Sequence, residues 1–297
     1  MKSISDIRAF VKINNPVTIA IAGVTREEME IAAEAVKEKI AHFIFIGDQQ
    51  EIDRLKAEMP AEVSDIPVYH VDHAHDAPQK AMDLINAGTA DIPMKGQVHT
   101  GTFVKAVLNK ANGYFSGGRL SQITMFDGYD KGLQFLTDCA INVDLTLEVK
   151  IDIIKNAVKT AKMFIPGIPK VALLGAVETV NAKMQDTAES AVITQMNRRG
   201  QIPDCIVDGP LSLDNAISKK FADMKGIDSP VAGEADILVA TSLNEANSLS
   251  KGIIHYANKE ACSIIAGTAK PVIMTSRTDL HQNKLNTIAV ACFMFNQ

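Results

Sequence analysis

A short apolar segment, an amphipathic segment and a second short apolar segment follow one another in residues 17–46, which read VTIAIAGVTREEMEIAAEAVKEKIAHFIFI. The two outer parts, Val17–Ala22 and His42–Ile46, are short, rich in Val and Ile, and apolar on both faces, as buried parallel strands are. The middle part, Arg26–Ile40, is rich in Ala, Glu and Lys, which favour a helix. Thr25 precedes it and a glutamate lies three residues later, which is the pattern of a capping box. These residues therefore predict a strand–helix–strand unit.

The same alternation continues along the chain. Further strands are predicted at Val68–Val71, Ile92–Met94, Ile123–Phe126, Gln134–Thr137, Val171–Leu174, Cys205–Val207, Ile237–Ala240, Cys262–Ala266 and Val272–Thr275. Apolar residues recur at helical spacings of four and three, forming one stripe, at Leu147, Ile151, Ile154, Val158 and Ala161. Strands that alternate with helices favour right-handed crossovers and a mostly parallel sheet covered on both faces. The sequence therefore predicts an α/β protein.

Two α/β domains are predicted, because 297 residues suffice for two ordinary domains that each have a core. The chain has no long Gly/Ser-rich or Pro-rich linker, so the boundary is inferred from Ile141–Asp144, which leads from a strand region into the long helix. The first domain is expected to comprise residues 1–140 and 268–297, and the second residues 141–267.

The composition excludes several classes of protein. Hydrophobic residues make up 46% of the chain and charged residues 22%, which is typical of a globular protein. The net charge of −5 gives no general attraction to nucleic acid or to an anionic membrane, so any anionic ligand needs a local cluster of donors. The apolar runs are too short to span a bilayer, and the first residues lack the apolar core of a signal peptide. We therefore expect a cytoplasmic protein with no nucleic-acid or membrane partner.

Neither the cysteines nor the histidines predict a metal site. The four cysteines are widely scattered and none forms a CxxC pair, so reduced and mostly buried thiols are expected. His70, His73 and His75 are close in sequence, but they follow a strand on a polar loop with no matching Cys or carboxylate. A solvated loop is the expected reading.

Polar residues follow the predicted strand Ile92–Met94 in the segment KGQVHT, residues 95–100. In parallel sheets, ligands collect at the carboxyl ends of strands. Gly96 permits close approach of the backbone, Lys95 adds a full charge, and N–H groups at the start of the next helix, predicted at Phe103–Asn109, suit a phosphate. An ordinary strand–helix turn with an exposed lysine explains the same residues equally well.

A hydroxyl, a guanidinium and a carboxylate follow the last predicted strand, at Ser276, Arg277 and Asp279. Arg277 could neutralise a phosphate, Ser276 could donate a hydrogen bond to it, and Asp279 could take a proton. A polar turn before the final helix fits these three residues as well.

Two further residues are candidates for the same chemistry. Arg119 follows a glycine-rich turn and could bind a phosphate or carboxylate in a forked manner, although a plain loop arginine fits the spacing too. Asp208 follows the predicted strand Cys205–Val207 and is expected at a strand end that faces a possible cleft. Capping of a helix by Ser212 or Asp214 explains that segment equally well.

Taken together, these segments resemble the phosphate acetyl/butyryltransferase family, and its butyryltransferase branch most closely. The resemblance covers nearly the whole chain in the right order. It rests on Met94-Lys95-Gly96 with Thr100, and on Thr102–Asn109, Asn181–Thr187, Val207–Ala216, Val231–Leu238 and Pro271–Arg277.

The resemblance implies a fold of two α/β domains of the isocitrate/isopropylmalate dehydrogenase-like type, with the active site in the interdomain cleft, and a homodimer or higher homo-oligomer. It implies transfer of a short acyl group, preferably butyryl, between coenzyme A (CoA) and inorganic phosphate. CoA is then a substrate, and no tightly bound cofactor or metal is expected. Catalysis is assigned to Ser276, Arg277 and Asp279, and binding of substrate and phosphate to Lys95, Gly96, Thr100, Arg119 and Asp208.

Three positions depart from the family pattern. The acetyltransferase branch has an acidic residue seven positions after the serine, where this chain has Asn283, so Asp279 is a substitute candidate for the general base. Relatives often have Gly-Asn where this chain has Ala246-Asn247, and Gly-Ala where it has Gly267-Thr268. These changes could shift the acyl preference or weaken CoA binding.

Two alternatives stay open. The three departures would suit a non-catalytic protein that binds acyl-CoA or phosphate. A metal- and NAD-dependent decarboxylating dehydrogenase would share the fold class, but it needs clustered aspartates for a divalent ion, and no convincing Asp-x-x-x-Asp cluster occurs at a suitable strand end.

Overall fold

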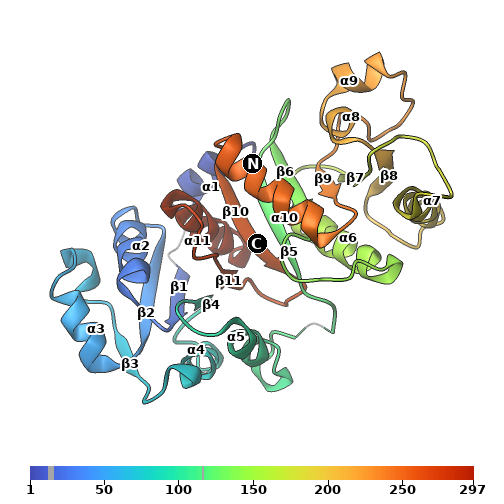
Figure 1. The fold of residues 1–297 in the computed structure, drawn as a ribbon. Coiled ribbons are helices and arrows are strands. Elements are labelled where there is room, and N and C mark those ends of the chain that lie inside the picture. The colour runs from blue at the N-terminus through green and yellow to red at the C-terminus, as the bar shows by residue number, and fades with distance from the viewer. Residues whose placement is uncertain (13–16, 116) are drawn as a thin grey trace. The chain divides into compact units, whose positions relative to one another are not determined.

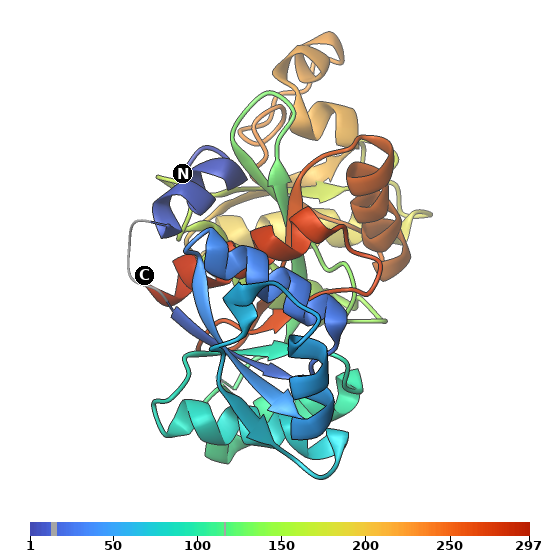
Figure 2. The same cartoon turned by 90° about the vertical axis from the view of Figure 1, so that its left-hand side faces the viewer.

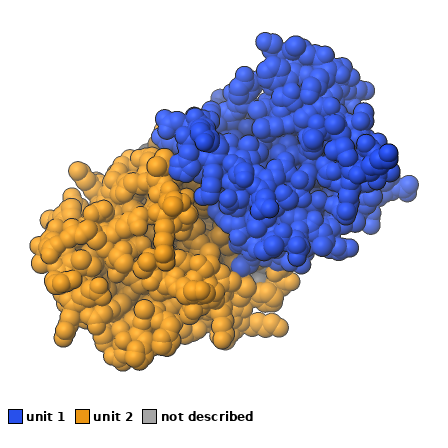
Figure 3. All heavy atoms as spheres, viewed as in Figure 1, with its two compact units in different colours: residues 1–4, 119–261 blue, residues 5–118, 262–297 orange. Residues whose placement is uncertain are grey.

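The fold is described by a computed structural model, which covers residues 1–12, 17–115 and 117–297. The chain forms two compact units, coloured separately in Figure 3. Unit 1 consists of residues 1–4 and 119–261, and unit 2 of residues 5–118 and 262–297. The two units are defined by contacts within the structure. The predicted domain boundaries at 140/141 and 267/268 stay a prediction.

Unit 2 is built on a five-stranded sheet in which every paired strand is parallel to its neighbour. The strand order is β11-β4-β1-β2-β3, with β1 Val17–Ala22, β2 Ala41–Gly47, β3 Val68–His70, β4 Ile92–Lys95 and β11 Ile273–Met274. Its helices are α1 Ile4–Val11, which begins in unit 1, α2 Arg26–Lys37, α3 Gln49–Lys56, α4 Ala77–Asn86, α5 Thr100–Val107 and α11 His281–Phe295, and short 3-10 turns lie at Ala61–Val63, Ala74–Asp76 and Lys110–Asn112. Helices α2 and α11 cover one face of the sheet, and α4 and α5 cover the other (Figures 1 and 2).

Unit 1 contains the sheet order β5-β6-β9-β7-β8, with β5 Ser121–Asp127, β6 Leu133–Thr137, β7 Lys170–Leu174, β8 Ile206–Leu211 and β9 Ile237–Val239. Its helices are α6 Leu147–Ala161, α7 Gln185–Arg198, α8 Leu213–Ile217, α9 Lys219–Met224 and α10 Leu243–Lys251, and a π-helical turn, Gly252–Tyr256, follows α10. Strand β10, Ala261–Ala266, begins at the last residue of unit 1 and continues into unit 2. Within the described ranges, no helix is both long and apolar enough to cross a bilayer.

The predicted α/β alternation and the mostly parallel sheets are confirmed, and every predicted strand is present. Strands β5 and β6 are antiparallel, unlike the parallel pairs of the unit 2 sheet. Only residues 128–132 separate these two strands, and so short a connection closes a hairpin, whereas a parallel crossover needs a dozen or more residues.

The helices differ from prediction mainly at their ends. Helix α2 starts at the predicted Thr25 cap, whose N–H donates to Glu28 Oε2 at 2.9 Å. It stops at Lys37 rather than Ile40, because Lys39 adopts a positive φ of 60° that a helix cannot continue through. Helix α5 begins at Thr100, three residues before the predicted start.

Helix α6 is present where the apolar stripe predicts a helix, but its buried face is rotated from that stripe. Ile154, Val158 and Ala161 are buried as expected, whereas Leu147 and Ile151 are partly exposed. Their places on the buried face are taken by residues that include Ile153 and Ala157.

Candidate functional site

The carboxyl edge of the unit 2 sheet gathers the polar segments singled out in the sequence. Parallel strands bring their carboxyl ends to one edge, and β4 and β11 are neighbours there. The register pairs Met274, the last residue of β11, with Lys95, the last residue of β4. The chain therefore leaves the sheet into Gly96 on one strand and into Thr275-Ser276 on the next.

A glycine pair fixes the path of the loop after β4. The Gly96 N–H donates to Ala22 O at 3.0 Å, and the Gln97 N–H donates to Gly23 O at 2.7 Å. A Cβ on Gly96 would lie 2.1 Å from Gly23 O, so no other residue fits without a shift of the backbone. Gly23 itself has φ +79°. The close backbone approach expected at Gly96 is therefore made by the loop after β1.

Lys95 is half-buried, and its Nζ donates to Gly96 O at 3.2 Å. Burial lowers the pKa of Lys95, and the Arg277 guanidinium lowers it further, while Glu28 acts in the opposite direction. Among the residues that the structure describes, neither Lys95 nor Arg277 forms an ion pair with a carboxylate. Two basic side chains thus share this edge with no ion-paired carboxylate among the described residues, which favours the binding of an anion.

The residues after β11 form a tight polar turn. The Ser276 N–H donates to Asp279 Oδ2 at 2.7 Å, and the Asp279 N–H donates to Ser276 O at 3.2 Å. The hydroxyls of Ser276 and Thr278 are 3.2 Å apart. Ser276 and Arg277 are exposed. One carboxylate oxygen of Asp279 therefore holds the turn that presents the serine and the arginine.

Helix α11 follows this turn and is tied to α2. Lys284 Nζ donates to Glu27 Oε1 in the first turn of α2, and the Lys284 side chain is only 4% exposed. His281 Nε2 lies 2.7 Å from Glu34 Oε2 of the same helix. Asn283, the position where the acetyltransferase branch is acidic, is buried. The first residues of the helix that follows the turn are thus bound to two carboxylates of α2, Glu27 in its first turn and Glu34 near its end.

The predicted site residues divide between the two units. Lys95, Gly96, Thr100, Ser276, Arg277 and Asp279 belong to unit 2, and Arg119 and Asp208 belong to unit 1. Thr100 is the exposed first residue of α5, so the N–H groups of that first turn follow directly on the Lys95 loop.

Arg119 is already engaged within unit 1. Its Nη1 donates to Asn142 Oδ1 at 3.3 Å, and its Nε lies 3.5 Å from Asp152 Oδ2. The Arg119 side chain is 42% exposed. Its role as a phosphate or CoA contact stays a prediction.

The predicted position of Asp208 at a strand end is wrong. Asp208 lies inside β8, opposite Ala172 of β7. Strand β8 continues through Gly209 and Pro210 to Leu211, and the register with β7 shifts between Ala172 and Leu174. A Gly-Pro pair normally ends a strand, and here the irregular register accommodates it.

A polar cluster around Glu178, in the loop after β7, was missed by sequence reasoning. Glu178 Oε1 accepts hydrogen bonds from Asn215 Nδ2 at 2.6 Å and Lys225 Nζ at 2.7 Å, and from the Ser212 hydroxyl. Lys225, then Ser212 and Asn215, lower the pKa of Glu178 to about 2. The available signal was its place just before the family-like segment Asn181–Thr187.

The histidines and cysteines in the described part of the chain form no cluster that could bind a metal. The His73 and His75 rings stack with centroids 5.3 Å apart, and His70 Nε2 lies 3.1 Å from Asp72 Oδ1. Within residues 1–12, 17–115 and 117–297, no group of three or more His, Cys, Asp or Glu could hold a metal ion. All four cysteines are buried free thiols, and burial raises the pKa of Cys139 to about 11 and that of Cys292 to about 12.

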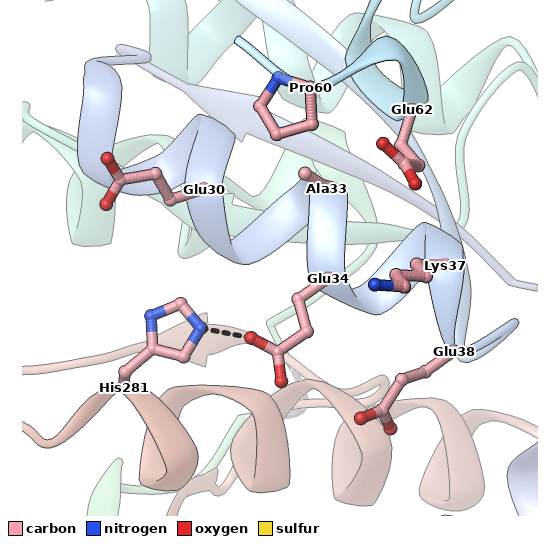
Figure 4. Close-up of a pocket in the computed structure, with 8 residues that line it drawn as sticks. All are labelled: Glu30, Ala33, Glu34, Lys37, Glu38, Pro60, Glu62 and His281. Carbon is pink, nitrogen blue, oxygen red and sulfur yellow. Dashed lines mark hydrogen bonds and ion pairs between the residues drawn. The ribbon is translucent and has the colours of Figure 1, made fainter.

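A pocket of about 570 Å³ opens beside α2 but has the wrong charge for phosphate or CoA (Figure 4). It is lined by Glu30, Ala33, Glu34, Lys37, Glu38, Pro60, Glu62 and His281. Four carboxylates against one lysine and one histidine repel an anionic substrate. The cationic edge at Lys95 and Arg277 is therefore the better candidate site.

Comparison with known proteins finds relatives over most of the chain. Residues 70–292 match the model of the family described as phosphate acetyl/butaryl transferase. The chain belongs to this family. It is 38% identical to the phosphate butyryltransferase of Clostridium acetobutylicum, over 99% of this chain and 98% of that protein. It is 34% identical to the phosphate acetyltransferase of Thermotoga maritima, over 92% of this chain and 93% of that protein.

The fold of this phosphate acetyl/butaryl transferase family member is also similar to that of a solved structure. The crystal structure of a branched-chain phosphotransacylase from Enterococcus faecalis matches with a TM-score of 0.83 at 29% identity. The match covers 95% of this chain and 99% of that chain. The family predicted from the sequence motifs is thus confirmed.

Proposed function

We propose that this chain is a phosphate acyltransferase that moves a short acyl group between CoA and inorganic phosphate. The observation that carries the proposal is the pair of cations, Lys95 and Arg277, at the ends of neighbouring strands with no carboxylate partner among the described residues. A phosphate group supplies the negative charge that this pair lacks. The relatives named for phosphate butyryl- and acetyltransferase activity support the same chemistry.

In the proposed reaction, the sulfur of CoA attacks the carbonyl carbon of an acyl phosphate, and phosphate leaves. Negative charge grows on the departing phosphate, so donors placed at that point bind the transition state more tightly than the substrate. We assign Arg277 to the phosphate oxygens, together with the Ser276 hydroxyl and the N–H groups that begin with Thr100. Asp279 keeps Ser276 and Arg277 in place through the hydrogen bond to the Ser276 N–H.

The finer features belong to the same proposal. We infer a preference for butyryl among short acyl groups, a homodimer or higher homo-oligomer, and the dehydrogenase-like two-domain arrangement, all from the resemblance of the sequence. Support for the acyl class comes from relatives that are named for butyryl, acetyl and branched-chain substrates. CoA acts as a substrate.

The test is the release of free thiol from acetyl-, propionyl-, butyryl- and isobutyryl-CoA with and without phosphate. The proposal expects release that requires phosphate and is fastest with butyryl-CoA. Tight binding of CoA without phosphate-dependent release would instead indicate a non-catalytic binder. Reduction of NAD with a hydroxy acid and magnesium, without thiol release, would indicate a dehydrogenase.

A further inference from the structure

The acyl transfer proposed above requires a group that carries a proton. The thiol of CoA has a pKa of about 8.5, so it is mostly protonated at neutral pH and must lose its proton as the sulfur attacks. The buried amide of Asn283 has no basic site for that proton. Asp279 Oδ2 accepts the Ser276 N–H at 2.7 Å, and Asp279 as the base is the competing assignment that the Lys95→Arg variant tests.

Lys95 is the titratable side chain placed for this task. It ends β4 beside β11, and the register sets it opposite Met274, two residues before Ser276. It is half-buried, and its hydrogen bond is to a backbone carbonyl, Gly96 O, rather than to a carboxylate. The charged groups that face it are Arg277, from the turn after β11, and Glu28, from the first turn of α2.

We propose that Lys95 carries the proton of the acyl transfer between thiol and phosphate. This inference rests on the proposed function of the chain. The neutral Lys95 amine takes the S–H proton while the carbon–sulfur bond forms. The bond between the acyl carbon and the phosphate oxygen then breaks, and the ammonium gives the proton to that oxygen. Nothing is oxidised or reduced, and the reverse reaction follows the same path.

The timing of charge favours this arrangement. In the fraction of the protein in which Lys95 is neutral, Arg277 alone carries the positive charge before the reaction, and Lys95 becomes charged as the sulfur attacks. Stabilisation that exists only in the transition state raises turnover rather than ground-state binding. Glu28 attracts the ammonium, but its effect on the pKa of Lys95 is smaller than the effects of burial and of Arg277.

The sign of the pH dependence follows from the environment of Lys95. Burial and then Arg277 lower its pKa below that of an ordinary lysine, so more of it is neutral at a given pH. With butyryl phosphate and CoA the neutral amine is required, so kcat/KM rises with pH. With butyryl-CoA and phosphate the neutral amine is required as well, because it takes the proton of the attacking phosphate oxygen and gives it to the departing sulfur, so Lys95 makes kcat/KM rise with pH in this direction too.

The decisive variant is Lys95→Arg, which keeps the positive charge but cannot release a proton. We expect it to lose about a hundredfold or more in kcat in both directions, the usual contribution of a positioned acid–base group. Lys56→Arg is the matched control, because Lys56 is also partly buried with a pKa lowered by burial, and it ends α3 next to β3 at the other end of the sheet. The control should keep wild-type rates and pH profile.

Two measurements keep the inference open to refutation. Lys95→Ala should regain activity with added small primary amines, and the regained rate should increase with amine basicity, which a purely structural role of Lys95 would not produce. If Lys95→Arg keeps the wild-type rate and pH profile, or if amines restore nothing in a folded Lys95→Ala, Lys95 is not the proton carrier. If the wild-type protein releases no thiol from butyryl-CoA with phosphate, the proposed function fails instead.

Discussion

Removal of the Arg277 guanidinium should lower the rate of acyl transfer strongly and change the free energy of unfolding little. The side chain is exposed and forms no ion pair with any residue that the structure describes, so Arg277→Ala leaves no buried group without a partner. Surface substitutions of this kind change the free energy of unfolding by about 0.5 kcal/mol or less. For a protein of this size that corresponds to a shift in melting temperature of no more than about 2 °C.

The catalytic loss from the same change should be much larger. One preorganised donor aimed at a developing negative charge contributes roughly 3 kcal/mol. Each ~1.4 kcal/mol is a factor of ten in rate, so kcat should fall by roughly a hundredfold. Because Arg277 also lowers the pKa of Lys95, its removal should shift the Lys95-dependent part of the pH profile to higher pH.

The assay is phosphate-dependent thiol release from butyryl-CoA, measured across pH with the melting temperature of each variant. Arg54→Ala is the matched control: it removes an exposed arginine from α3, which packs on β3 at the far end of the sheet from β11. Arg277→Lys should give an intermediate loss, because it keeps the charge and loses the forked geometry. A rate for Arg277→Ala within a factor of three of the Arg54→Ala rate would remove Arg277 from the mechanism.

Three further outcomes test the parts that hold the site. Glu27→Ala should lower the free energy of unfolding by roughly 3 kcal/mol, because it leaves the Lys284 ammonium, whose side chain is 4% exposed, buried without its partner. Lys284→Met should lower it by only about 1 kcal/mol, because the Glu27 side chain that loses its partner is 48% exposed. Equal losses in chemical denaturation would contradict this asymmetry. Gly96→Ala puts a Cβ 2.1 Å from a carbonyl oxygen where ordinary contact begins at 3.4 Å, so it should lose about 2 kcal/mol or more and most activity, whereas Gly118→Ala, which meets nothing within 4 Å, should lose neither. The pKa of Glu178 is lowered from 4.5 to about 2, so its contribution to stability is complete above pH 4.5 and is lost as pH falls from there towards 2. Glu178→Gln should therefore flatten the dependence of stability on pH in that window, as followed by denaturant unfolding, and an unchanged slope would show that the cluster contributes nothing there.

The strands and their alternation with helices could be predicted because the signal is local. Segments such as Val17–Ala22 and Ile237–Ala240 carry enough Val and Ile to be buried on both faces wherever the sheet places them. The order β11-β4-β1-β2-β3 could not be predicted, because it depends on crossovers between segments far apart in sequence. The antiparallel pairing of β5 with β6 does have a local signal in the sequence, because the connection between the two strands is too short for a parallel crossover.

The sequence was enough to single out residues of the candidate site, but not to show which of them lie together or what holds them in place. Lys95 and Ser276-Arg277 were found because polar residues at strand ends are a local pattern, and their adjacency follows from a β4–β11 pairing that no local pattern reports. The partners that hold them were missed, since Glu27 and Lys284 are 257 positions apart. Asp208 was misplaced because the strand runs on through a Gly-Pro pair.

The positive character of the carboxyl edge arises from how its neighbouring carboxylates are used. Helix α2 begins at this edge with Glu27 and Glu28, two negative charges that would otherwise neutralise Lys95 and Arg277. Glu27 is bound by Lys284, and Glu28 accepts the cap hydrogen bonds of Thr25. The later glutamates of α2 line the acidic pocket on the side of the helix shown in Figure 4. We propose that a chain with net charge −5 holds a phosphate at this edge because Lys284 pairs with Glu27 and because Glu28 affects Lys95 less than burial and Arg277 do.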